Sequence, residues 1–202
     1  WSMFYNCNSL TYLNLSNFDT SQVTDMTSMF YNCISLTYLN ISNFNTSNVN
    51  YMRYMFYQCN ALTVLDVSNF DTSNVKSMEH MFFNCTFLTS LNLSNFDTSN
   101  VSFFQWMFCS SYNLEYINIE KFSFEKLNYS DYSNTMFDYV PDNIVICFKN
   151  DIKILLNYLK NKKCFINDCS NDWKKNQKKL INNNNTTNLI NNISFLIYVN
   201  VI

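Results

Sequence analysis

Glycine is absent from this 202-residue chain, and proline, alanine and histidine occur once each, as Pro141, Ala61 and His80. The lack of glycine excludes a glycine-rich phosphate loop, because that loop needs glycine for the close approach of the backbone to the phosphate. It also requires every tight turn to use Asn, Asp or Ser, which tolerate such conformations. A single histidine leaves little material for acid–base catalysis, so we expect no enzyme.

Positive charge is also scarce, with 13 basic against 15 acidic residues and a net charge of −2. The chain therefore has no basic excess with which to neutralise phosphates, and we expect no nucleic-acid partner. The apolar run at residues 193–202 is shorter than the ~20 residues that span a bilayer, so we expect no membrane span. Apolar residues still make up 48% of the chain, which is ample for a core.

A 26-residue repeat dominates the sequence. The pair Met-Phe occurs at Met3-Phe4, Met29-Phe30, Met55-Phe56, Met81-Phe82 and Met107-Phe108. Leucine keeps the same spacing at Leu10, Leu36, Leu62, Leu88 and Leu114. Such a fixed period is typical of proteins in which each unit buries its apolar face against the next.

Each repeat has two apolar patterns. Leu13 and Leu15 alternate with Asn14, which predicts a strand with the leucines inside and Asn14 outside. The next segment places Val23, Met26, Phe30 and Cys33 three, four and three residues apart, and this spacing favours a short helix or 3₁₀ run. We therefore predict an α/β repeat fold: a leucine-rich-repeat solenoid with short parallel strands, short helical returns and about five 26-residue repeats.

Stacked repeats place equivalent residues about 5 Å apart, so recurring residues form ladders. We expect an aromatic ladder at Phe18, Phe44, Phe70, Phe96 and Phe122. We expect turn-to-turn hydrogen bonds from Asn17, Asn43, Asn69 and Asn95. Asp19, Asp71 and Asp97 recur where Asn45 also fits, which favours a turn or cap role over a catalytic one.

The repeat resembles the BspA-like class of leucine-rich-repeat surface proteins. The motif SNFDTSNV at 94–101 and the half-motif MFxxC, as at Met3–Cys7, carry the resemblance, which covers about residues 1–137. The resemblance implies surface display and adhesion in general terms. It supplies no catalytic residues and no particular ligand.

The repeat pattern stops after Phe137. We predict a solenoid at 1–137, a small α/β capping region at 138–181 and a low-complexity Asn-rich tail at 182–202. In the capping region we expect strands at 144–148 and 164–166 and a helix at 151–160. The chain starts inside a repeat, so we expect it to be a fragment, and end-to-end self-association through the uncapped unit is possible.

The eight cysteines fall into two groups. Cys7, Cys33, Cys59 and Cys85 recur with the repeat, and we expect buried free thiols there, because parallel side chains on stacked strands give poor disulfide geometry. Cys109, Cys147, Cys164 and Cys169 are irregular, and both a disulfide among them and free thiols remain open. No C-x-x-C pair occurs, so we expect no metal and no cofactor.

The outward strand positions are the candidate ligand-binding residues, because solenoids commonly bind through this face. They are Tyr12, Asn14, Tyr38, Asn40, Val64, Asp66, Ser90, Asn92, Tyr116 and Asn118. The tyrosines offer contact area with a polar tip, although they also suit sideways packing along the sheet. We expect a cell-surface or secreted module that binds protein or glycan; the alternative is a structural spacer. The positions that vary most lie elsewhere, at 53–54, 79–80 and 105–106, and we expect His80 among them to be a surface residue.

Overall fold

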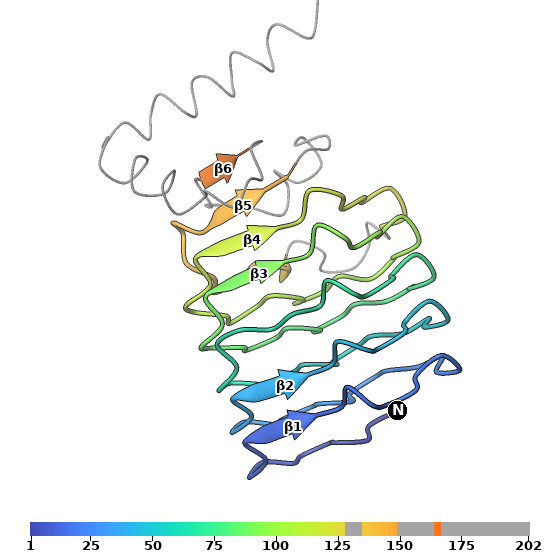
Figure 1. Ribbon diagram of the computed structural model, residues 1–202. Helices are drawn as coiled ribbons and strands as arrows, with labels where there is room; N and C mark the ends of the chain where they lie inside the picture. Colours follow the sequence, from blue (N-terminus) through green and yellow to red (C-terminus); the bar gives the residue numbers. More distant parts are fainter. Residues whose placement is uncertain (128–134, 149–163, 167–202) are drawn as a thin grey trace, which may run out of the picture.

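The protein is a stack of repeat units, each lying beside the next along one axis (Figure 1). The computed structural model describes residues 1–127, 135–148 and 164–166. The N-terminus lies in the unit at one end of the stack, and the strands follow one another in chain order towards the other end (Figure 1).

Short parallel strands line one side of the stack. They are β1 (Tyr12–Asn14), β2 (Tyr38–Asn40), β3 (Ser90–Asn92), β4 (Tyr116–Asn118), β5 (Val145–Cys147) and β6 (Cys164–Ile166). They form a two-stranded sheet, β1-β2, and a four-stranded sheet, β3-β4-β5-β6. Tyr12 pairs with Tyr38, so each residue lies beside the equivalent residue 26 positions later in the next unit. Residues 63–66, the equivalent segment of the third unit, have no strand and separate the two sheets.

The strands predicted at 144–148 and 164–166 are present as β5 and β6. Tyr116 pairs with Val145, an offset of 29 residues, because three extra residues precede the Met136-Phe137 pair. The helix predicted at 151–160 and the tail at 182–202 lie outside the described residues. No helix among the described residues is long and apolar enough to cross a membrane.

The prediction of helical returns is wrong for the described residues, which contain no α-helix. A second parallel ladder takes the place of the helices, through the bridges Asp25↔Tyr51, Tyr51↔Ser77 and Ser77↔Phe103. Backbone bonds in these returns run between units: the Phe56 N–H donates to the Met81 carbonyl at 2.9 Å. A series of turns can bury side chains three and four residues apart, as an amphipathic helix does. The periodicity therefore predicted correctly which residues are buried, but it predicted the wrong secondary structure.

Left-handed backbone conformations explain why no helix forms. Two positions in each unit have positive φ, as at Ser28 (57°) and Asn32 (58°), and each one interrupts a right-handed helical run. The expectation that only Asn, Asp or Ser fills such tight positions is wrong, because the later units also place Tyr54, Gln58, His80 and Trp106 there, beside Asn84 and Ser110. Each costs about 1–2 kcal/mol. The bonds to the next unit, such as Asn32 N–H to the Tyr57 carbonyl at 2.7 Å, hold the conformation in place.

The core is a set of ladders running through the stack. The Met-Phe phenylalanines form a continuous column of stacked rings, with centroids 5.2–5.8 Å apart: Phe4, Phe30, Phe56, Phe82, Phe108 and Phe137. The aromatic ladder predicted at Phe18, Phe44, Phe70, Phe96 and Phe122 is less tightly stacked than this column. Phe70 and Phe96 stack at 6.3 Å, and Phe18 at the end of the stack is 38% exposed.

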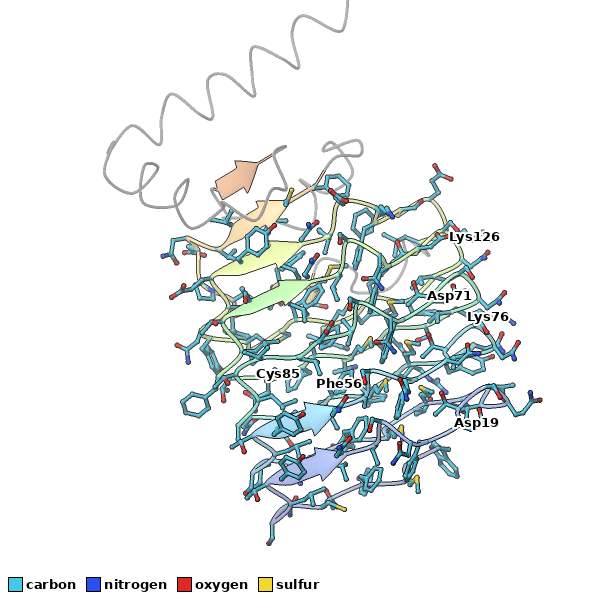
Figure 2. The ribbon with its side chains drawn as sticks, viewed as in Figure 1. Asp19, Phe56, Asp71, Lys76, Cys85 and Lys126 are labelled. Carbon is cyan, nitrogen blue, oxygen red and sulfur yellow. The ribbon has the colours of Figure 1, made fainter. Side chains whose placement is uncertain are left out.

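The repeat cysteines are free thiols, as predicted. The Cys59 and Cys85 thiols each donate to a backbone carbonyl of the previous unit at 3.2 Å. Ser111, the residue at this position in the fifth unit, makes the same bond to Phe82 at 3.1 Å. Burial raises the pKa of the Cys33 thiol to about 11 and that of Cys85 to about 12, so both groups stay protonated at neutral pH. Figure 2 shows Cys85 and Phe56 inside the stack.

Polar side chains bond one turn to the next. The predicted asparagine bonds are present at three of the four positions: the Asn43 amide donates to the Ser16 carbonyl, the Asn69 amide to the Phe44 carbonyl at 2.8 Å, and the Asn95 amide to the Phe70 carbonyl at 2.8 Å. Asp19 and Asp71 accept the N–H of the serine two residues on, at 2.9 and 3.0 Å, which confirms a turn role. Both lie at the outer edge of the turns in Figure 2.

Candidate functional site

Two stacked tyrosines stand out on the strand face. The rings of Tyr12 on β1 and Tyr38 on β2 lie 4.6 Å apart and 5° from parallel. They are 59% and 46% exposed. Their register pairing fixes the distance between the backbones, so each ring limits the rotation of the other. The pair is therefore an exposed aromatic surface held in one arrangement.

The polar members of the candidate site serve first as turn formers. The Asn14 and Asn40 Oδ1 atoms accept the N–H of Ser16 (3.0 Å) and Ser42 (3.1 Å), respectively. Asp66 and Asn92 do the same with the serine two residues on, at 2.9 and 3.1 Å. Each side chain has thus committed one oxygen to the backbone, and the asparagines keep their NH₂ groups for a ligand.

The candidate residues do not form one continuous surface. Val64 is 77% exposed but lies in the segment without a strand, and Ser90 is exposed on β3. The prediction that Tyr116 and Asn118 are exposed is wrong, because they are 5% and 4% exposed. Val145, the register partner of Tyr116, is buried too, so this end of the face is covered. The strand pairing of β1 with β2 places Tyr12 beside Tyr38 and Asn14 beside Asn40.

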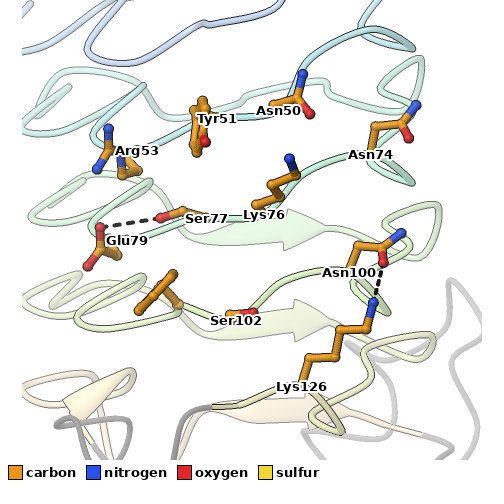
Figure 3. A pocket seen from close by; sticks show the side chains of 11 residues that line it. Asn50, Tyr51, Arg53, Asn74, Lys76, Ser77, Glu79, Asn100, Ser102 and Lys126 are labelled. Atoms are coloured by element: carbon orange, nitrogen blue, oxygen red, sulfur yellow. Dashed lines mark hydrogen bonds between the residues drawn. The ribbon is translucent and has the colours of Figure 1, made fainter.

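A pocket that the strand pattern does not predict lies over the second ladder. It has a volume of about 770 Å³. Its lining residues come from neighbouring units (Figure 3): Asn50, Tyr51, Arg53, Asn74, Lys76, Ser77, Glu79, Asn100, Ser102, Phe103 and Lys126. Two of them, Arg53 and Glu79, belong to the positions that vary most between repeats. We refer to this pocket as the ladder groove.

Interactions inside the ladder groove order part of its lining. The Arg53 guanidinium lies 5.3 Å from the centre of the Tyr51 ring. The Ser77 hydroxyl donates to Glu79 at 3.3 Å, and Lys126 donates to Asn100; Figure 3 draws both bonds. Examining one repeat position at a time misses this site, because its residues come from several different positions of the repeat.

His80 is half-buried, so the prediction of a surface histidine is wrong. Its ring lies between Tyr54 at 4.6 Å and Trp106 at 4.9 Å, which occupy the same repeat position in the flanking units. The buried Nδ1 atom has no hydrogen-bond partner among the described residues. Burial lowers the pKa of His80 to about 4, because the charged form loses its hydration.

We expect the stability of the protein to fall as the pH is lowered from about 6.5 towards 4. His80 stays neutral in the folded state over this window, whereas the unfolded chain binds a proton there, so acid favours unfolding. The lowered carboxyl pKa values of Asp66 and Asp71 add a loss mainly as the pH falls through about 3.8, the unfolded value, so they contribute little at about pH 4.5. Denaturant midpoints at about pH 7 and about pH 4.5 measure the effect. His80→Tyr, which copies Tyr54 of the preceding unit, should remove this loss; an equal loss in that variant would contradict the assignment.

The described residues contain no group of three His, Cys, Asp or Glu side chains that could hold a metal ion. Among the irregular cysteines, Cys109 is a buried free thiol and Cys147 is disulfide-bonded. Of the two alternatives left open for these cysteines, the disulfide therefore holds for Cys147 and the free thiol for Cys109. The location of Cys169 is outside the described residues.

Comparison with known proteins gives one family. The model of a family described as "Mycoplasma protein of unknown function, DUF285" matches residues 1–122 and again 63–141, which together cover more than half of the chain. The two overlapping matches fall on the repeats. No curated protein and no solved structure matches the chain.

Proposed function

This chain belongs to the DUF285 family, and on that premise we propose that it is a non-enzymatic binding module displayed on the surface of a cell or secreted from it. Its ligand is a protein or a glycan, bound on the strand face around Tyr12 and Tyr38. The finer fold assignment within this proposal is a BspA-like leucine-rich-repeat solenoid whose returns are turns instead of helices.

The exposed pair of stacked tyrosines is the observation that carries this proposal. Tyr12 and Tyr38 leave about half of each ring open to solvent, although most large apolar side chains of the repeat are buried. Stacking restricts both rings before a ligand arrives, so a ligand loses little side-chain entropy on binding them. Asn14 and Asn40 lie on the same two strands as the tyrosines, and their Oδ1 atoms are bonded to the backbone, which leaves their NH₂ groups as donors.

Two further observations support the class and the location. Among the described residues, the histidine is half-buried and its pKa is lowered by burial alone, and the repeat carboxylates Asp19 and Asp71 act in turns, so these residues form no acid–base pair. The disulfide of Cys147 supports an oxidising compartment, because such bonds are rare in the cytosol. Both favour an extracellular binding role over catalysis.

A spacer role is the second candidate, and one observation favours it. The Asn and Asp side chains of the strand face form turns, and the same bond recurs from Asn14 to Asn92. A face whose polar groups serve the backbone in this way suits a rigid connector as well as a receptor. The two roles differ in whether the tyrosines matter for binding.

We expect the double variant Tyr12→Ser/Tyr38→Ser to lose binding to its ligand by at least about tenfold while it remains folded. Ser90 holds the same strand position, so the repeat accepts serine there. The ligand is identified by applying the wild-type chain to an array of glycans and extracellular proteins, and affinities are then measured by calorimetry. Circular dichroism checks the fold, and Tyr139→Ser, a change at a tyrosine that is 72% exposed outside this face, is the control. Unchanged affinity in the double variant would contradict the strand-face site.

A further inference from the structure

Positive charge is concentrated in the ladder groove. Residues 1–127 contain four basic side chains, Arg53, Lys76, Lys121 and Lys126. Three of them line the groove, and Lys121 does not. The same part of the chain holds nine carboxylate side chains, of which only Glu79 lines the groove. The groove is therefore a positive site in an acidic part of the protein, which favours an anionic ligand.

The groove also exposes two aromatic rings. Tyr51 and Phe103 are 37% and 36% exposed, and they flank Ser77 in the second ladder, where the side chain is small and buried. One ladder step is about 5 Å, so the two aromatic positions are about 10 Å apart along the stack. Ser77 thus leaves the second ladder without a bulky side chain between the two exposed aromatic residues.

Several polar groups of the groove remain available to a ligand. The Lys76 side chain is exposed and has no hydrogen-bond or ion-pair partner among the described residues, and the Arg53 side chain is half-buried. Asn50 and Asn74 use their NH₂ groups on backbone carbonyls, at 3.2 and 2.7 Å, which leaves their Oδ1 atoms as acceptors. The groove therefore offers cationic donors beside neutral acceptors.

We propose that the ladder groove binds an acidic glycan, a sugar chain that carries carboxylate or sulfate groups. Lys76, Arg53 and Lys126 pair with its acidic groups, and the Asn50 and Asn74 oxygens accept bonds from its hydroxyls. The exposed rings of the groove pack against the apolar faces of its sugar rings. This site is separate from the strand face and does not depend on it.

An acidic peptide fits this groove less well. One way in which an extended peptide binds is by adding a strand to a free sheet edge. The backbone of the second ladder is already bonded between units, as in Met52 N–H to the Ser77 carbonyl at 3.1 Å and Met78 N–H to the Phe103 carbonyl at 3.0 Å.

The test is isothermal calorimetry with the full 202-residue chain and four probes of similar length. They are a heparin oligosaccharide, a hyaluronan oligosaccharide, a neutral cello-oligosaccharide and polyglutamate. We expect binding to heparin, to hyaluronan or to both, which separates sulfate from carboxylate recognition, and we expect this binding to weaken with salt. Failure of both acidic oligosaccharides to bind, or polyglutamate binding as tightly as they do, would overturn the proposal.

The repeat provides substitutions that the fold already accepts. Each introduces the residue found at the equivalent position of the preceding repeat: Lys76→Asn copies Asn50, Arg53→Thr copies Thr27, and Phe103→Ser copies Ser77. We expect the Lys76→Asn/Arg53→Thr double variant to lose at least about tenfold in affinity for the acidic oligosaccharide, and Phe103→Ser to lose several-fold.

Lys121→Gln is the matched control, since it removes a positive charge from the same part of the chain outside the groove. Its affinity should stay within about twofold of wild type. An equal loss in Lys121→Gln, or no loss in Phe103→Ser, would show attraction by net charge alone and overturn the proposed site. The Tyr12→Ser/Tyr38→Ser variant should bind the acidic oligosaccharide normally, which keeps this test independent of the strand face.

Discussion

Replacing Phe56 by alanine is expected to lower the free energy of unfolding by about 3–5 kcal/mol. Phe56 is fully buried and stacks at 5.5 Å on both Phe30 and Phe82, so its removal leaves a cavity in the middle of the phenylalanine column. Neighbouring units cannot close that cavity easily, because backbone bonds fix their spacing. Chemical denaturation followed by circular dichroism measures the change.

Phe87→Ala is the control for this prediction. It makes the same substitution at a phenylalanine that is 58% exposed, and it should cost less than about 1 kcal/mol. Equal losses in Phe56→Ala and Phe87→Ala would mean that the phenylalanine column is not the core of the stack.

Replacing Thr46 by valine is expected to cost about 1–3 kcal/mol, although valine has nearly the same shape. The Thr46 side chain is 1% exposed; its hydroxyl donates to the Asp71 carbonyl at 2.8 Å and accepts the Asp71 N–H at 2.8 Å. Valine removes both bonds to the backbone of Asp71 at once, and each intramolecular hydrogen bond contributes about 0.5–1.5 kcal/mol. The same paired contact joins Thr20 to Asn45 and Thr98 to Ser123.

Two companion variants separate the hydroxyl from the side-chain shape. Thr46→Ser keeps the hydroxyl and should recover most of the stability, while Thr63→Val changes an exposed threonine and should have little effect. Unfolding midpoints of the three variants give the comparison. If Thr46→Val were as stable as wild type, the threonine contacts would not be holding the turns together.

The sequence predicts the buried side of this fold better than its backbone. A strict period of 26 identifies equivalent residues, and these lie in ladders: the free thiols at Cys59 and Cys85 and the asparagine bonds at Asn69 and Asn95 were all predictable. The secondary structure of the returns was not predictable, because a series of turns with left-handed residues and a helix can bury side chains at the same spacing. Without glycine, positions with positive φ such as Tyr54 and Gln58 carry no recognisable sequence signal.

The candidate sites were predictable only in part, for two physical reasons. Tyr12 and Tyr38 are exposed as expected, but Tyr116 is buried, since the C-terminal end of the sheet does not repeat the environment of the first units. The ladder groove depends on which repeat positions of one unit lie next to which positions of the following unit. That arrangement follows from the turn geometry, so the clustering of Arg53, Lys76 and Lys126 becomes visible only in three dimensions.

The strand face and the ladder groove differ in chemistry. Tyr12 and Tyr38 form a neutral aromatic surface, whereas Lys76 and Lys126 make the groove cationic. Binding at the strand face should therefore change little with ionic strength, while binding in the groove should weaken as salt rises. A stack of this kind can present both surfaces because each unit contributes a strand residue and a ladder residue.

Binding of the intact chain to an array of glycans and extracellular proteins tests the central claim most directly. The account predicts at least one ligand that the folded protein binds, with binding lost in Tyr12→Ser/Tyr38→Ser or in Lys76→Asn/Arg53→Thr. A chain that gives a native circular dichroism spectrum and binds none of the array would contradict a binding module, and the repeats would then act as a spacer.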